Sequence, residues 1–202
     1  MTGGAGQQAG ARAARRLAEL GVCVLEPGLS GAEFDRIEAE YGIAFAEDHR
    51  AFLAAGLPVD RVPSADGSAS ARNPWVDWRD GDPAAIRERL AWPVEGLLFS
   101  VEEGWWPGDR WGERPAEPGR AVEEARDRLA SVPRLVPLYS HRYLPSGHGV
   151  HGSPVLSVYG ADVIHYGRDL ADYVEREFVG WDAGAAGGEP VRGVPFWSDL
   201  VV

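Results

Sequence analysis

The sequence contains no lysine and only one cysteine, Cys23, among its 202 residues. A single cysteine excludes an intramolecular disulfide and any zinc knuckle built from cysteine pairs, so a reducing cytoplasm is the expected compartment. No stretch of about 18 apolar residues occurs, and the first residues lack the apolar run of a secretory signal, which argues against a membrane span and against export. The missing lysine, beside abundant alanine, glycine and arginine, is typical of a GC-rich coding bias.

Basic residues are also in the minority. The chain has 31 acidic and 20 basic residues, which gives a formal net charge of −11. Such a charge opposes binding to the phosphate backbone of nucleic acids and favours a monomer or a weak dimer. It also steers encounters with a basic protein, so the expected partner is a protein, and neither nucleic acid nor a membrane.

Tryptophan, in contrast, is abundant, with eight residues in the chain. Five of them fall within a segment rich in turn formers and charge: Trp75, Trp78, Trp105, Trp106 and Trp111. Indoles combine a large apolar area with one N–H donor, so they are enriched at binding hot spots and in half-buried grooves. We interpret Trp78 and Trp92 as core or half-buried anchors, because the first lies beside charged residues and the second precedes a proline.

The remaining three tryptophans lie in a predicted loop. Trp105 and Trp106 are adjacent, and two neighbouring rings on an extended chain point in opposite directions. At least one of them is therefore exposed or covered by another segment. With Trp111, Arg110 and Arg114 nearby, the group forms either a hot spot for a partner or an internal cation–π stack.

Periodicity and capping signals indicate a mixture of helices and strands. Residues 1–10 show no period and are predicted to be a disordered lead. Ser30 and Glu33 form a capping-box pattern, Asp82-Pro83 starts a helix, and Asp169 caps the last one. The predicted helices span residues 11–20, 31–41, 47–53, 83–90, 121–129 and 170–178.

The strand signals are concentrated in the second half of the chain. Residues 135–139, 154–159 and 162–166 are rich in β-branched and aromatic side chains, and the glycine break at 160 predicts a hairpin between the last two. Residues 95–101 are also predicted as a strand, 22–25 as a strand or a packed connection, 57–73 as a loop and 103–119 as a long aromatic loop. The sequence thus predicts an α+β fold over 11–180, with a C-terminal extension, 181–202, that docks on the body through its apolar end.

The order of these motifs resembles the SUKH superfamily, which includes fungal cell-wall-synthesis regulators and many bacterial immunity proteins. The resemblance spans residues 26–180. It rests on Tyr41-Gly42-Ile43, on residues 48–53 (DHRAFL) and on residues 163–173 (VIHYGRDLADY), with support from Arg114-Pro115 and residues 196–199 (FWSD). It implies an α+β fold in which helices flank a mainly antiparallel sheet, no catalytic centre and no cofactor. It further implies a protein partner, typically a toxin encoded beside the gene.

Other kinds of chemistry have weaker support. Residues 4–9 and 147–152 resemble nucleotide-binding glycine motifs, but neither stands between a strand and a helix. Cys23 lies in an apolar run and Ser30 is explained as a helix cap, so no hydrolase nucleophile is indicated. His141, His148 and His151 lie within eleven residues, which leaves a small metal-assisted enzyme as one alternative. A regulatory adaptor without a toxin partner is the other.

The sequence therefore predicts a non-enzymatic binding protein, with an immunity protein against a basic toxin as the preferred version. Carboxylates near the tryptophans would attract the partner, and the loop indoles would fill its pockets. The predicted partner-binding residues are Trp105, Trp106, Trp111, Asp77, Asp80, Glu102, Glu103 and Asp109.

Overall fold

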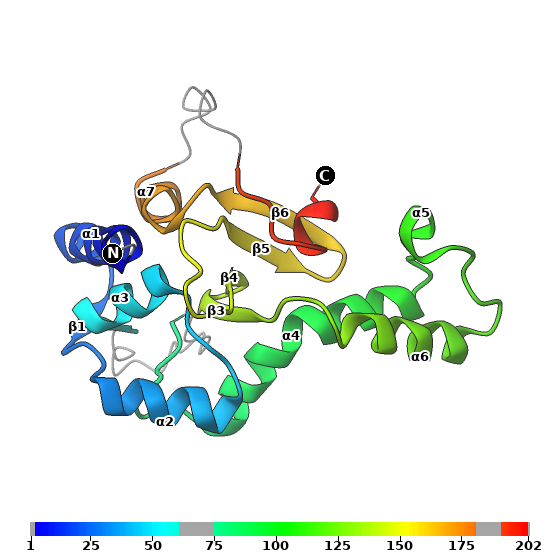
Figure 1. Cartoon of the computed structure of the whole chain (residues 1–202), viewed down its shortest axis with the longest axis horizontal. Coiled ribbons are helices and arrows are strands. Elements are labelled where there is room, and N and C mark those ends of the chain that lie inside the picture. The colour runs from blue at the N-terminus through cyan, green and yellow to red at the C-terminus, as the bar shows by residue number, and fades with distance from the viewer. Residues whose placement is uncertain (1–2, 61–74, 181–190, 202) are drawn as a thin grey trace, which may run out of the picture.

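An antiparallel sheet with helices on both faces organises the chain (Figure 1). The computed structural model describes residues 3–60, 75–180 and 191–201. The four strands of the main sheet are β3 (Leu135–Tyr139), β4 (Arg142–Pro145), β5 (Val155–Tyr159) and β6 (Asp162–Gly167), in that spatial order. Each strand pairs with the next along the chain, so the sheet is a meander, and the α+β prediction is confirmed.

The sequence patterns located β3, β5 and β6 but missed β4. Tyr159 pairs with Asp162 across the predicted hairpin. β4 was hidden because it begins with a charged residue, Arg142, which is nevertheless 8% exposed. Its guanidinium donates to the Ser157 hydroxyl at 2.9 Å and to the Glu177 carboxylate at 3.0 Å, and these partners compensate for its burial.

Both edges of the main sheet are partly covered by other segments. Trp75 forms an isolated bridge with Tyr139 at the β3 edge, and Val201 forms a parallel bridge with Val163 at the β6 edge. The C-terminal segment reaches β6 through a short 3-10 turn, η2 (Trp197–Asp199). Trp197 is only 1% exposed, and its indole donates to the Pro133 carbonyl at 2.7 Å. The end of the chain therefore lies against the body.

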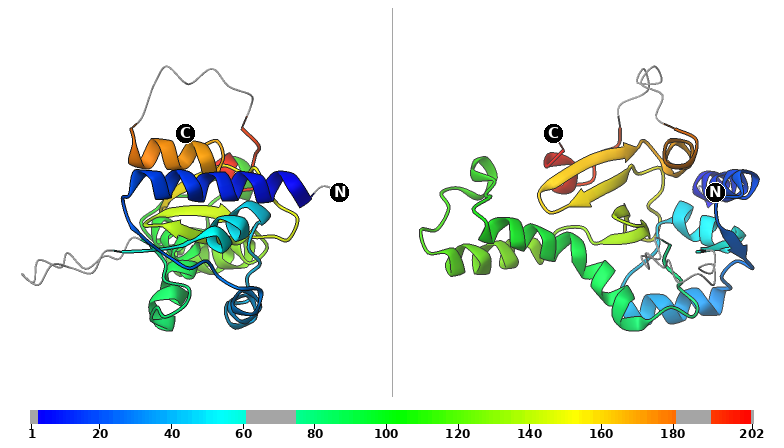
Figure 2. Two further views of the ribbon diagram at one scale, coloured as in Figure 1. Left: turned by 90° about the vertical axis from the view of Figure 1, so that its left-hand side faces the viewer. Right: turned by 180° about the vertical axis from the view of Figure 1, so that it is seen from behind.

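The N-terminal helix α1 (Gly3–Leu20) begins well before the predicted start at residue 11. It lies against α3 (Glu47–Ala55) and α7 (Leu170–Phe178), as both views of Figure 2 show. The prediction of a disordered lead is wrong for residues 3–10. Glycine weakens a helix in isolation, but Gly6 and Gly10 are buried where α1 approaches α3, so tertiary contact stabilises this part of the helix.

Helix α2 (Gly31–Tyr41) begins at the predicted capping box. The backbone N–H of Glu33 donates to the Ser30 hydroxyl, and the Glu33 carboxylate accepts from the Ser30 N–H at 2.7 Å. The Arg79 guanidinium donates to the other carboxylate oxygen at 2.6 Å, and these hydrogen bonds lower the pKa of Glu33 to about 2. Gly42 ends the helix in the left-handed conformation, with φ 61°.

Removing the cap should destabilise the fold measurably. We expect Ser30→Ala to lower the free energy of unfolding by about 1 kcal/mol, because the Glu33 N–H at the start of the helix loses its acceptor. Ser131→Ala is the matched control, since the Ser131 hydroxyl contacts only the Arg128 carbonyl at the surface. Urea unfolding of both variants measures the difference, and equal midpoints would show that the cap contributes nothing.

Helix α4 (Pro83–Glu102) replaces the predicted strand at 95–101. Pro93 lies inside this helix and removes one backbone hydrogen bond, which is why the sequence suggested an end there. The apolar residues that follow are spaced as on a helix, at 94, 97, 98 and 101, and their burial outweighs the loss. α4 then continues through α5 (Gly108–Trp111) to α6 (Pro118–Leu129), which packs along α4, so the predicted aromatic loop contains a short helix.

Figure 1 shows α4, α5 and α6 extending from the sheet as an arm, with α5 at its tip. On the opposite side, β1 (Val24–Glu26) and β2 (Leu57–Val59) form a small antiparallel sheet. The predicted loop at 57–73 is therefore wrong for 57–59, and most of its remainder lies outside the described residues, as does the predicted glycine-rich stretch at 184–188.

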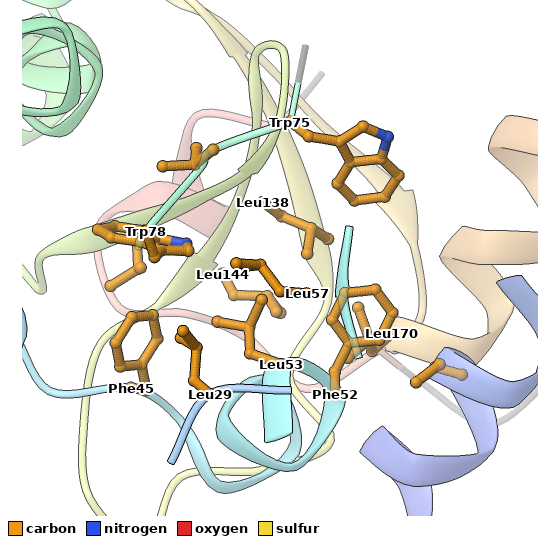
Figure 3. Close-up of a cluster of buried hydrophobic side chains, with 14 of the residues drawn as sticks. Leu29, Phe45, Phe52, Leu53, Leu57, Trp75, Trp78, Leu138, Leu144 and Leu170 are labelled. Carbon is orange, nitrogen blue, oxygen red and sulfur yellow. The ribbon is translucent and has the colours of Figure 1, made fainter. Parts of the chain in front are cut away.

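The main sheet separates two hydrophobic cores. One core contains Trp75, Trp78, Phe45, Phe52 and Leu144, part of which Figure 3 shows. The other lies between the sheet, the arm and the C-terminal segment, and contains Leu97, Tyr143 and Trp197. Neighbouring residues on β4, Tyr143 and Leu144, thus face opposite cores, as strand geometry requires.

Candidate binding surface

The three loop tryptophans form an internal cluster. Trp111 is 8% exposed, and its ring centroid lies 4.9 Å from that of Trp106 and 6.1 Å from that of Trp105. The Arg128 guanidinium lies 5.8 Å from the Trp111 ring, and the Trp106 indole donates to the Gly112 carbonyl at 2.8 Å. Trp111 is therefore buried in this conformation, which fits the internal stack better than the hot spot, whereas Trp105 and Trp106 are half-buried.

This cluster also joins the arm to the C-terminal segment. The Phe196 ring stacks on Trp111 with 6.2 Å between centroids and 12° between planes, and Arg110 forms an ion pair with Asp199. Phe196 adopts φ 68°, a conformation that costs a non-glycine residue about 1–3 kcal/mol. The stacking and the ion pair offset this strain, so the indoles serve a structural purpose at the arm.

The predicted acidic residues do not form one surface. The Asp77 carboxylate accepts the N–H groups of Arg79 and Asp80 at 3.0 Å each, so it stabilises a turn. Asp80 is exposed but precedes α4, whereas Asp109 is at the tip of the arm, beyond the whole length of that helix. A helix of this size is about 30 Å long, so one small contact cannot include both ends.

Glu102 and Glu103, in contrast, continue an exposed face of α4. Glu88, Trp92, Phe99 and Glu103 are spaced by four, seven and four residues, which places them on one side of the helix. Trp92 is 39% exposed and Phe99 63% exposed. With Tyr159 of β5, 67% exposed, they form a surface that we call the α4 ridge: Glu88, Trp92, Phe99, Glu102, Glu103 and Tyr159.

The β5–β6 turn holds the ridge in place. A Cβ at Gly96 would lie 3.3 Å from the backbone of Gly160, so the turn packs closely on α4 at this glycine. The Ala161 N–H also donates to the Ser100 hydroxyl at 3.2 Å. These contacts between the turn and α4 place the Tyr159 ring 6.1 Å from that of Trp92, in a tilted arrangement.

The ridge was not recognised in the sequence. Trp92, interpreted as a core or half-buried anchor, lies outside the core at 39% exposure, and Phe99 and Tyr159 were not singled out. The spacing of 92, 96, 99 and 103 was the available signal, but it becomes visible only when the helix is continued through Pro93. Within the described part of the chain, Glu102 and Glu103 form no ion pair, and Glu88 interacts with Arg89 only electrostatically, so the ridge carries three exposed carboxylates.

The three histidines of the metal hypothesis lie apart. His141 is on the β3–β4 turn with its ring 6.4 Å from Tyr159, while His148 lies 3.9 Å from Glu38 of α2. The Cβ of His151 faces Gly6 of α1. Across residues 3–60, 75–180 and 191–201, no group of three histidine, cysteine or acidic side chains has an arrangement for a metal ion.

Two serine–histidine pairs meet: the neighbours Ser140 and His141, 3.1 Å apart at the exposed β3–β4 turn, and Ser198 with His165. The His165 Nε2 atom lies 3.0 Å from the Ser198 hydroxyl, and burial lowers the pKa of His165. The same hydroxyl accepts the Val194 N–H at 2.7 Å, so it already closes the turn of the C-terminal segment. Among the described residues no carboxylate orients the other ring nitrogen, and we interpret the pair as a lock for this segment.

Comparison of the chain with family models, with curated proteins and with solved structures finds no match in any of the three. Among the described helices, none is both long enough and apolar enough to cross a bilayer. Among the described residues, the α4 ridge is where exposed aromatic rings and exposed carboxylates lie together.

Proposed function

We propose that this chain is a non-enzymatic binding module for a basic protein and that the α4 ridge is its contact surface. The observation that carries the proposal is the exposure of three large aromatic rings, Trp92, Phe99 and Tyr159, beside three exposed carboxylates. Exposed apolar surface costs free energy in water, and burial against a partner recovers it.

The two kinds of residue have different roles in this proposal. Aromatic rings at the centre of an interface contribute most of the affinity once water is excluded. The carboxylates, together with the net charge of −11, accelerate encounter with a basic partner and select against acidic ones. The aromatic rings of the ridge thus provide affinity, and its carboxylates attract a basic partner.

In its preferred version, the partner is a toxin that the chain neutralises in the cytoplasm. The resemblance of the sequence motifs to the SUKH superfamily supports this version, and the helices that flank an antiparallel meander are compatible with the fold that it implies. A fold alone is weak warrant for a function. The proposal therefore relies on the ridge as well as on the resemblance.

The test uses the product of the adjacent open reading frame as the partner in titration calorimetry. We expect Trp92→Ala with Phe99→Ala to weaken binding roughly 100-fold or more, because each truncation removes an anchor. Val179→Ala, an exposed apolar residue at the end of α7, is the control and should leave the affinity unchanged.

A second double variant, Trp105→Ala with Trp106→Ala, tests the surface indicated by the sequence. If it abolished binding while retaining its fold, and the ridge variant bound normally, the arm tip would be the contact surface. Unrelated metabolic genes beside this one would remove the support for a toxin and leave a regulatory adaptor as the alternative. Metal bound stoichiometrically by the purified chain would instead favour the metal-assisted enzyme.

A further inference from the structure

A cavity of about 390 Å³ opens between the end of α2, the middle of α4 and the chain that enters β3. Most of its wall is apolar, and the residues of this wall include Ile43, Leu90, Val94, Val132, Pro133 and Trp197. The Trp197 ring is fixed in this wall, because its indole already donates to the Pro133 carbonyl. The cavity therefore presents a preformed apolar surface.

Polar groups at the mouth of the cavity already have partners. The Arg87 guanidinium lies 5.2 Å from the Tyr41 ring and donates to the Glu40 carboxylate at 3.4 Å. Arg134 donates to the Gly42 carbonyl at 2.8 Å, and Glu95 accepts from Arg126 at 3.3 Å. Two carboxylates and two guanidinium groups balance at this mouth, so its composition favours an apolar occupant over an ion.

The cavity and the α4 ridge lie on neighbouring faces of the same helix. Ala91 and Glu95 line the cavity, while Trp92 and Phe99 belong to the ridge. Consecutive residues of a helix are about 100° apart, so a protein seated on Trp92 also lies over the mouth beside Ala91. Continuity with the ridge and the charge of its carboxylates together indicate which molecule fills the cavity.

We infer that this cavity receives a large apolar side chain, aromatic or leucine, from the basic protein that docks on the ridge. The identity of the occupant rests on the proposed function. Anchors of this kind insert into desolvated pockets near the centre of an interface, where they contribute far more than contacts at the rim. In this arrangement the ridge attracts and contacts the partner, and the side chain in the cavity fixes the partner's position.

The cavity is tested first without a partner. In two-dimensional NMR spectra of the full chain, N-acetyl-phenylalaninamide should shift the methyl signals of Leu90, Val94 and Val132, with a dissociation constant on the order of 1 mM. N-acetyl-glycinamide should shift none of them. Ala91→Phe, which fills the mouth, should abolish the shifts, whereas Ala84→Phe, two turns earlier on α4, should preserve them.

The same variants are then measured against the adjacent gene's product. We expect Ala91→Phe to weaken binding about tenfold or more and Ala84→Phe to leave it unchanged. If the probe shifted no cavity signal, or if Ala91→Phe bound the partner with wild-type affinity, the inference would be wrong. If the probe bound in the cavity but the wild-type chain bound no partner, the cavity would stand as an apolar site and the proposed function would fail.

Discussion

Replacing Gly10 by alanine is expected to lower the free energy of unfolding by about 2 kcal/mol, although alanine is the better helix former. Helix propensity alone favours alanine by about 0.8–1.0 kcal/mol. A Cβ at this position, however, would lie 2.0 Å from the Asp48 carbonyl oxygen and 2.7 Å from the Phe52 nitrogen of α3. These are backbone atoms that cannot rotate away, so we expect the cost of overpacking to exceed the gain in helix propensity and the variant to be less stable.

Gly4→Ala is the matched control for this prediction. Gly4 belongs to the same helix, and its nearest neighbour for a Cβ is the side chain of Gln8 at 3.9 Å. We expect this variant to be as stable as the wild type or slightly more stable. Urea unfolding monitored by circular dichroism measures both, and equal effects of the two substitutions would mean that α1 does not dock on α3 through residues 3–10.

The features that were predictable from the sequence depend on local chemistry. Ser30 and Glu33 satisfy each other's backbone groups, and the Asp82 and Asp169 side chains cap α4 and α7 as expected. Each of these motifs needs only residues two or three positions apart. The β5–β6 hairpin is similar, because Gly160 at φ 59° supplies the turn conformation within the segment itself.

The features that were missed depend on contacts between distant segments. Gly10 remains helical because α3 lies against it. Pro93 remains helical because the apolar residues that follow it on α4 are buried, and Arg142 enters a strand because Glu177 pairs with it. Local propensity contradicts the observed structure at all three positions, and tertiary packing outweighs it.

Contacts with distant segments also decide which tryptophans are buried and which are exposed. Composition identified the indoles but not the direction in which each points. Trp111 is buried because Phe196, 85 residues later, stacks on it. Trp92 is exposed because the β5–β6 turn packs on Gly96 and does not cover the Trp92 ring. Exposure at a candidate interface depends on how the arm packs, so the sequence alone did not show which of these indoles reach solvent.

The largest pH effect is expected from His49 of α3. This side chain is fully buried, and neither of its ring nitrogens has a hydrogen-bond partner among the described residues. Burial lowers its pKa from 6.5 to about 3. The Phe45 ring meets the imidazole edge to face at 5.2 Å, which is an apolar environment for a polar group.

The sign of the effect follows from the two protonation states. Below pH 6.5 the unfolded chain binds a proton at His49, while the folded chain does not until the pH approaches about 3. Stability is therefore lost as the pH falls through this window, at up to about 1.4 kcal/mol per pH unit. Burial raises the pKa of the neighbouring Asp48, which acts in the opposite direction, so the wild-type curve alone does not isolate His49.

His49→Leu isolates this contribution. At pH 7 we expect the variant to be more stable than the wild type by about 1–3 kcal/mol, because two unsatisfied buried nitrogens are removed. The difference should grow further as the pH falls from 6.5 to 4. His49→Gln separates the two causes, since it removes the titration but retains an unsatisfied polar group: it should abolish the pH-dependent part without the gain at pH 7. Urea unfolding at several pH values measures both variants, and a constant difference between His49→Leu and the wild type across this window would show that the imidazole has an unseen partner or reaches solvent.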